Sequence, residues 1–193
     1  MIKQYNGAKA QRRAARELLP AGGYVAKILD AQVQHYDFRN GDSVDKLILS
    51  FDISEGVYTG FFKRDYNNNT NEDRKWRGVY RYLNIPKDDG SEQDGWTKRK
   101  FKTFTNAVED SNSGYAWNWD ETTLKGKLFG ALYREKEFEG TSGDVITTTE
   151  CGGSTDIASI RSGDFRLPKD KLLERPATVN NAYAAVPDDD LPF

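Results

Sequence analysis

The sequence predicts a mainly β fold in which a long helical insertion separates the third strand from the fourth of five strands. The clearest strand signal is the alternation of apolar and polar residues over positions 45–54. Apolar residues take helical spacing between about positions 66 and 120, and strand-like runs return after position 123. With 193 residues, the chain fits one domain with added segments.

The N-terminal segment, residues 1–20, predicts a basic helical arm, because it is rich in Ala and Arg and is stopped by Pro20. The run GYVAKILDAQVQHY that follows predicts the first strand. Asn40 and Gly41 tolerate positive φ and therefore predict the turn after this strand.

The second and third strands are predicted on either side of a Glu-Gly turn. In DKLILSFDIS, the residues Leu47, Leu49, Phe51 and Ile53 share one face, as in a half-buried strand. VYTGFFKRDY, which follows the turn, predicts a third strand with aromatic residues on both faces.

Two helical pieces are predicted in the insertion, joined by the polar loop IPKDDGSEQDG. The first piece carries helically spaced apolar residues at Trp76, Val79, Tyr80 and Leu83. The second piece carries them at Phe101, Phe104 and Val108. After the insertion, TLKGKLFGALYREKEFEG and GDVITTTE predict the fourth and fifth strands, with GTSG as their hairpin loop.

Three strands, a helical connection and two more strands form the chain order of the five-stranded OB-fold barrel. SH3-like barrels and small α+β sheets share much of this order. We expect an OB-fold domain over residues 21–176, with the insertion at about 66–120. Residues 177–193 are expected to form a flexible acidic tail, since their short apolar runs cannot offset an ordering entropy of about 1–2 kcal/mol per residue.

Cysteine and histidine are nearly absent, which excludes several chemistries. Cys151 and His35 are the only residues of their types, so disulfides, cysteine-cluster metal sites and cysteine–histidine nucleophile pairs are ruled out. No spacing of carboxylates singles out a magnesium site. We therefore expect no catalysis, no metal and no cofactor.

The longest apolar stretches are too short to span a bilayer, and the N-terminus has no apolar signal core. We expect a cytoplasmic protein without membrane contact.

Charge is distributed unevenly along the chain, although the net charge is only −2. Residues 1–27 contain a single acid, Glu17, and their basic residues are Lys3, Lys9, Arg12, Arg13, Arg16 and Lys27. The last eleven residues contain three Asp and no basic residue. Such asymmetry indicates a protein that handles nucleic acid.

The last six residues, DDDLPF, resemble the acidic tip of bacterial single-stranded DNA-binding proteins, in which an Asp run precedes an apolar residue, Pro and a terminal Phe. The body, especially LKGKLFGALYREKEFEGTSGDV followed by IRSGDFRLPK, is similar to a family of phage and prophage proteins found among recombination and replication functions. The resemblance implies a protein that coats single-stranded DNA with its barrel in the cytoplasm of a bacterial host. It also implies a tip that recruits replication or recombination proteins through Asp188, Asp189, Asp190, Leu191, Pro192 and Phe193.

An OB-fold binds its ligand mainly with strands two and three and with the loops that join strands one to two and four to five. Flat rings there stack on bases, and cations follow the phosphates. The residues expected on this face are Tyr36, Phe38, Arg39, Lys46, Tyr58, Phe62 and Arg64. For each aromatic residue among them, burial in the core is an equal alternative.

The insertion offers a second set of candidate DNA-binding residues, although a charged helix is usually just a solvated face. These candidates are Trp76, Lys98, Arg99 and Lys100. Trp117 and Trp119, two positions apart, could form a sugar-binding platform, but tryptophans in such a segment more often plug the core.

The sequence thus predicts a non-catalytic single-stranded DNA-binding protein of phage or prophage replication or recombination. The alternative is an OB-like recombination adaptor, a protein-interaction module with little direct DNA binding. Exposure of Tyr36, Phe38, Tyr58 and Phe62 on one positive face would favour DNA binding, and burial of these rings would favour the adaptor. Whether copies of the chain form a homo-oligomer stays open.

Overall fold

A computed structural model describes residues 17–174 of the chain. It confirms the mainly β prediction, because the strands form one five-stranded antiparallel sheet in the order β3-β2-β1-β4-β5. The strands are β1 (Gly22–Asp37), β2 (Ser43–Ile53), β3 (Val79–Asn84), β4 (Leu128–Glu139) and β5 (Val145–Thr155). The helices are α1 (Phe61–Asn68), α2 (Glu92–Ser111), the 3-10 turn η1 (Glu121–Leu124) and α3 (Ile157–Ser162).

Two predicted segments fall outside this range. Residues 1–16 of the predicted basic arm and residues 177–193, with the acidic tip, lie outside the described residues.

The alternation predicted for β2 is confirmed. Leu47, Leu49, Phe51 and Ile53 are all at most 2% exposed and form the centre of the core. In the neighbouring β1, the register with β2 shifts between Ile28 and Asp30, which is a β-bulge. A bulge changes which face the following residues occupy, and this explains why no single parity describes the apolar residues of β1.

The predicted third strand is wrong, since VYTGFFKRDY forms a turn followed by α1. Gly60 precedes the helix with φ 70°. The carboxylate of Asp52 on β2 then accepts hydrogen bonds from the backbone N–H groups of Phe62 (2.9 Å) and Lys63 (3.2 Å). A residue distant in sequence therefore satisfies the free donors at the start of the helix. Phe61 and Phe62 pack into the core from this helix.

The actual third strand, β3, lies in the segment predicted as the first helix. Its Tyr80 and Leu83 are buried and pair with Leu49 and Leu47 of β2. The strand is entered through Gly78, where a Cβ atom would lie only 2.1 Å from the backbone oxygen of Phe51. The close approach at this glycine allows β3 to pair with β2, and pairing with β2 overrides the helical spacing.

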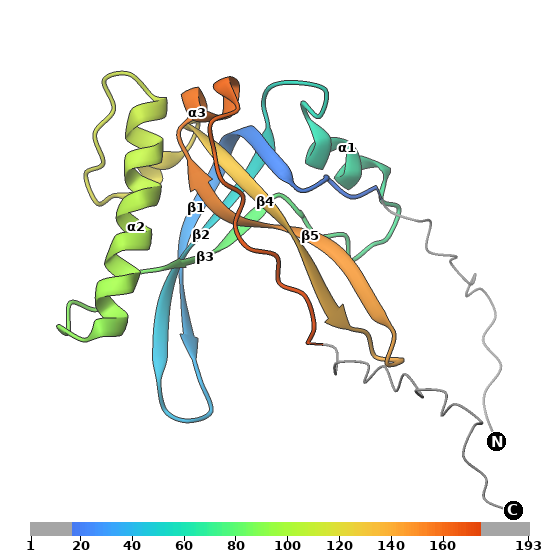
Figure 1. Cartoon of the computed structure of the whole chain (residues 1–193), viewed down its shortest axis with the longest axis horizontal. Helices are drawn as coiled ribbons and strands as arrows, with labels where there is room; N and C mark the ends of the chain where they lie inside the picture. The colour runs from blue at the N-terminus through green and yellow to red at the C-terminus, as the bar shows by residue number, and fades with distance from the viewer. Residues whose placement is uncertain (1–16, 175–193) are drawn as a thin grey trace, which may run out of the picture.

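The second predicted helix is confirmed as α2, and Figure 1 shows it at one end of the sheet. Ser91 caps it by accepting a hydrogen bond from the backbone N–H of Asp94 (3.1 Å). Phe101, Phe104 and Val108 face the core, as predicted.

The sheet is not closed into a barrel, because β3 and β5 are its two edges. The edges nevertheless approach each other, since the Tyr82 hydroxyl on β3 donates to a carboxylate oxygen of Glu150 on β5 (2.5 Å). Two long hairpins, β1–β2 and β4–β5, extend from the body of the molecule (Figure 1). Within residues 17–174, no helix has the length and apolar character needed to cross a membrane.

Candidate functional site

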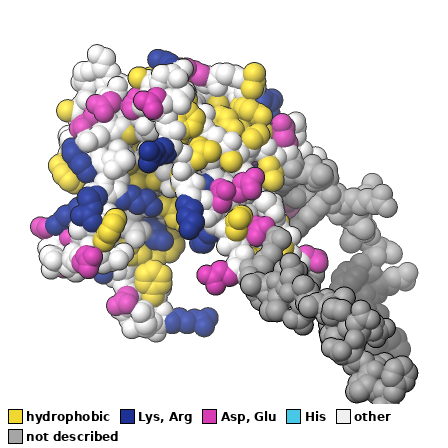
Figure 2. Space-filling view, viewed as in Figure 1, with side chains coloured by type: hydrophobic (Ala, Val, Ile, Leu, Met, Phe, Trp, Pro, Cys, Tyr) yellow, Lys and Arg dark blue, Asp and Glu magenta, His cyan; other side chains and the backbone are white. Residues whose placement is uncertain are grey.

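Four basic side chains from three elements come together beside the gap between β3 and β5. We call this set the central cationic cluster: Lys46 of β2, Lys100 of α2, and Arg134 and Lys136 of β4. Figure 2 shows Lys and Arg side chains gathered over the lower part of α2 and the centre of this face, while Asp and Glu gather toward the β4–β5 hairpin.

Two tyrosine rings lie among these cations. The Tyr82 ring centroid is 5.5 Å from Lys100 Nζ and 5.7 Å from Arg134 Cζ. Lys46 Nζ lies 5.0 Å from the centroid of the Tyr36 ring. Each ring therefore has a cation at cation–π distance. Positive charge and flat apolar surface stand side by side, which is the combination that binds nucleotides.

Glu150 is the acidic member of the site and holds β3, β4 and β5 together. It accepts hydrogen bonds from Tyr82 (2.5 Å), Arg134 Nη2 (2.8 Å) and Lys136 Nζ (2.9 Å), and its side chain is only 14% exposed. Burial raises the pKa of Glu150, but these three donors outweigh the burial and hold the pKa below 4.5. The carboxylate is therefore ionised at neutral pH.

Lys100 has no acidic partner within residues 17–174. Partial burial of its ammonium group lowers its pKa from 10.5, and the positive charges of Arg134 and Lys46 lower it further. Mutual repulsion of this kind is relieved by an anion. The site is thus arranged to attract negative charge.

A groove of about 400 Å³ continues this site along the gap between the edge strands. Its walls include Val79, Arg81 and Tyr82 on one side and Thr148 to Cys151 on the other. Lys75, Arg77 and Lys136 also line it. Because Arg77 is bound to Asp65 at 3.0 Å, the charge available to a ligand comes mainly from the other basic residues.

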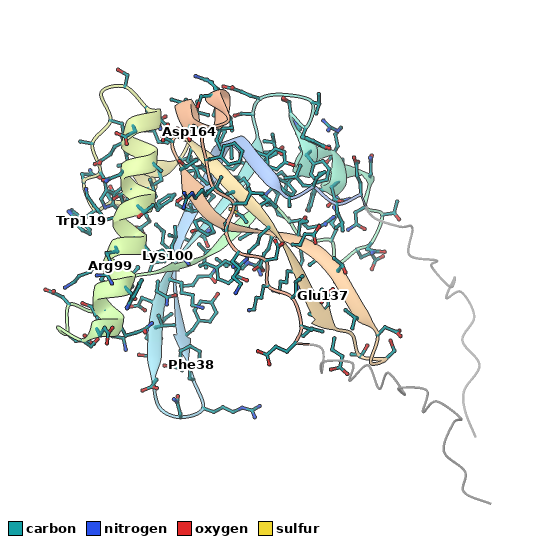
Figure 3. The ribbon with its side chains drawn as sticks, viewed as in Figure 1. Phe38, Arg99, Lys100, Trp119, Glu137 and Asp164 are labelled. Carbon is teal, nitrogen blue, oxygen red and sulfur yellow. The ribbon has the colours of Figure 1, made fainter. Side chains whose placement is uncertain are left out.

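The predicted residues of the β1–β2 hairpin lie at the surface. Tyr36 is 38% exposed and Phe38 is 50% exposed, and Figure 3 shows Phe38 near the end of the hairpin. Arg39 is exposed beside them. Lys46, on the second strand of the same hairpin, is half-buried and belongs to the central cationic cluster.

The three candidates assigned to the third strand lie elsewhere. Phe62 is 3% exposed and packs edge-on against Phe51 in the core, so its ring is not available for stacking. Tyr58 is half-buried against Tyr24. Arg64 is exposed on α1, where its guanidinium donates to the Thr59 carbonyl. The structure does not bring these residues into the central cationic cluster.

Most of the candidates in the insertion also lie outside the central cationic cluster. Trp76 is half-buried, and its indole N–H donates to the Phe51 carbonyl (3.1 Å). Lys98 is bound by Asp94 at 3.0 Å and also contacts Asp88. Arg99 is exposed and stacks on Trp96 at 4.4 Å. Of the four, only Lys100 joins the cluster.

Sequence reasoning missed Arg134, Lys136 and Glu150, and it did not single out Tyr82 as a binding residue. A signal for two of them was present, because Arg134 and Lys136 are two positions apart in the predicted fourth strand and therefore share a face. Tyr82 was read as part of a helix, and Glu150 was the last residue of a short predicted strand. The pairing of Arg134 with Glu150 follows from the β4–β5 register.

The single cysteine and the single histidine lie on different strands of the sheet. Cys151 is buried in the core, and burial raises the pKa of its thiol to about 12. His35 lies on the β1–β2 hairpin between Asp45 (2.6 Å) and Asp37 (3.1 Å), whose hydrogen bonds raise its pKa. Among the described residues, no three His, Cys, Asp or Glu side chains are placed to hold a metal ion.

A scan of the chain against models of known protein families finds no match, and a search of curated proteins also finds none.

Proposed function

We propose that the protein is a non-catalytic single-stranded DNA-binding protein of phage or prophage replication or recombination. The observation that carries the proposal is the central cationic cluster, in which Lys46, Lys100 and Arg134 lie against the exposed and half-buried rings of Tyr36 and Tyr82. Cations of this kind neutralise phosphates, and each stacked base contributes about 1–3 kcal/mol. On this proposal the protein acts in the cytoplasm of a bacterial host.

We also propose that the sheet is an OB-type barrel left open between β3 and β5. Support comes from the strand order, with β1 at the centre, and from the contact between Tyr82 and Glu150 across the open edge. The OB-fold is a five-stranded, partly open barrel whose long loops flank the ligand. In this arrangement, the β1–β2 and β4–β5 hairpins would border the DNA.

Lys100→Gln tests the DNA-binding proposal. Lys100 has no acidic partner in the described part of the chain, so its removal leaves the fold intact while it lowers affinity for oligothymidine by about 3- to 10-fold. The control is Lys63→Gln, which removes an exposed cation from α1. Fluorescence anisotropy with labelled oligothymidine and with duplex DNA gives the readout. Absence of binding to oligothymidine at low salt would refute the proposal.

The proposed role of the tip is recruitment of partner proteins by residues 188–193. The charges of Asp188, Asp189 and Asp190 would steer the tip to a basic partner, and the ring of Phe193 would enter a pocket. Deletion of these six residues should abolish recruitment of replication or recombination proteins and leave oligothymidine affinity equal or higher. Unchanged recruitment would contradict this role.

The adaptor alternative is favoured by a different observation. Phe138 and Ile146 are cross-strand partners on the β4–β5 hairpin and are 41% and 42% exposed, so they form a small apolar surface. On the adaptor reading, Phe138→Ala and Ile146→Ala would abolish binding to a recombination protein, and oligothymidine would bind weakly to the parent protein. Strong oligothymidine binding by the parent separates the two functions.

A further inference from the structure

The outer face of α2 carries two strongly exposed tryptophans. Trp96 is 60% exposed on the helix itself, and Trp119 is 77% exposed in the loop that follows it. Large rings with this exposure are uncommon on a solvated surface. Trp119 does not plug the core, so the expectation from its spacing with Trp117 is wrong for this ring.

Helical geometry places basic residues between these two rings. Positions three and four apart are neighbours on a helix surface, so Trp96 lies beside both Arg99 and Lys100. Arg99 in turn neighbours Lys102, which is three positions further along and whose exposed Nζ lies 3.9 Å from a carboxylate oxygen of Glu109. An arc of alternating rings and cations therefore begins at Lys100 in the central cationic cluster and runs over the outside of α2. Figure 3 shows Lys100 on the side of α2 nearer the sheet and Arg99 on the other side.

Trp119 stands at the far end of this arc. Its ring is nearly parallel to that of Phe101, with planes 4° apart and centroids 6.4 Å apart. Phe101 is a helix neighbour of Lys98, which lies three positions before it. Figure 3 shows Trp119 on the same outer side of α2 as Arg99.

The loop holds Trp119 in a fixed and costly conformation. Trp119 has φ 66°, the left-handed region that side chains other than Gly, Asn and Asp rarely adopt. On one side, the backbone N–H of Trp117 donates to Glu109 of α2 (2.8 Å). On the other side, the carboxylate of Asp120 accepts from the backbone N–H of Thr122 (3.0 Å). A strained residue that its surroundings hold rigidly, with its ring in solvent, is a sign of a binding role.

We infer that the outer face of α2 is a second single-stranded DNA-binding surface, on which Trp96 and Trp119 stack bases and Arg99 and Lys102 contact phosphates. The inference rests on the proposed function and extends its DNA path beyond the central cationic cluster. Single-stranded nucleic acid fits better than a protein partner, because the two rings are separated by cations and do not form one continuous apolar patch.

Oligomer length separates this surface from the central cationic cluster. An oligothymidine of about 6 nucleotides is long enough to occupy the central cationic cluster alone. One of about 20 nucleotides is longer than the binding site of a single OB-fold domain, so it can reach a second surface. The double variant Trp96→Ala/Trp119→Asn should bind the short oligomer as the parent does. Its affinity for the long oligomer should fall about 5- to 100-fold, as expected for the loss of one stacked base or more.

The variant is expected to fold, because Asn tolerates the left-handed conformation at position 119 and Ala favours the helix at position 96. Val57→Ala, which removes an 89% exposed apolar side chain ahead of α1, is the matched control and should change neither affinity. Thermal unfolding of all three proteins checks that differences in binding do not reflect loss of structure.

The outcomes distinguish this inference from the proposed function. Equal affinity of parent and double variant for the long oligomer would overturn the inference and leave the proposed function standing. Failure of the parent to bind either oligomer would overturn both. If sedimentation showed that the double variant changes only the oligomeric state, the surface would join copies of the chain and the inference would be wrong.

Discussion

The negative charge of Glu150 offsets part of the positive charge of the central cationic cluster. Glu150→Gln keeps the size of the side chain but removes the charge that Arg134 and Lys136 contact. We expect the free energy of unfolding at neutral pH to fall by about 1–3 kcal/mol, because two half-buried cations lose their partner. We also expect affinity for oligothymidine to rise, since the groove becomes more positive. Urea unfolding and anisotropy titration measure the two effects.

The pH dependence gives the sign of the Glu150 contribution. The pKa of Glu150 in the folded protein is below 4.5. The carboxylate therefore stabilises the fold fully above about pH 4.5, and this stabilisation is lost as the pH falls through the lower pKa of the folded state. The difference in stability between parent and Glu150→Gln should therefore shrink at acid pH. A difference that grows with acid would show that the carboxylate does not carry the effect.

His35 provides a second prediction for one residue. Hydrogen bonds to Asp45 and then Asp37 raise its pKa above 6.5. The stabilisation of the β1–β2 hairpin by the charged ring is complete below about 6.5 and is lost as pH rises through the raised value. As His35 is the only histidine, its ring signals in an NMR titration are unambiguous. Asp45→Asn should lower the measured pKa, and an unchanged value would contradict the assigned contacts.

At the scale of the elements, a crowded glycine, Gly78, tests how β3 packs on β2, and an uncrowded glycine in α2 serves as its control. In Gly78→Ala, the new Cβ would lie 2.1 Å from the Phe51 backbone oxygen and 2.6 Å from the Phe62 ring. We expect this substitution to lower the free energy of unfolding by about 1–3 kcal/mol, as overpacking does.

Gly95→Ala is the matched control, because its new Cβ would meet only the end of the Arg99 side chain, at 3.9 Å. Gly95 lies within α2, where Ala is favoured over Gly by about 0.5–1 kcal/mol. The two substitutions should thus shift the urea midpoint in opposite directions. A shift in the same direction would mean that the close approach at Gly78 does not limit the packing of β3.

The spacing of apolar residues predicted the elements that bury one face along their whole length. It failed for segments whose secondary structure depends on contacts with residues from another part of the chain. β2 and α2 were predicted because one face of each meets the core throughout. Within residues 57–84, the predicted strand is the helix α1 and the predicted helix contains the strand β3. Neither was predicted, because α1 is capped by Asp52 and β3 forms by pairing with β2. The same limit applies to the candidate site. Lys46, Lys100 and Tyr36 were recognised by type, but Tyr82 and Glu150 acquire their roles only when β3 and β5 meet.

For the whole molecule, the uneven distribution of charge predicts a strong dependence of binding on salt. Each phosphate neutralised on a single strand contributes about −0.7 to the slope of log K against log salt. Simultaneous removal of Lys46 and Lys100 should therefore reduce the slope by about 1.4. Titration of oligothymidine at several salt concentrations measures this. If the slopes of parent and variant coincide, these two lysines do not contact phosphates.

The way β1 joins β4 has a consequence for how the chain folds. Each long hairpin pairs residues that are close in sequence, whereas the strand pairing that joins the two hairpins runs from Gly22 to Lys27 on β1 and from Leu128 to Tyr133 on β4. This ladder closes a loop of about a hundred residues, and loop-closure entropy must be overcome before its contacts can form. The hairpins are thus expected to form early and independently. We expect the joining of the two hairpins to limit the folding rate.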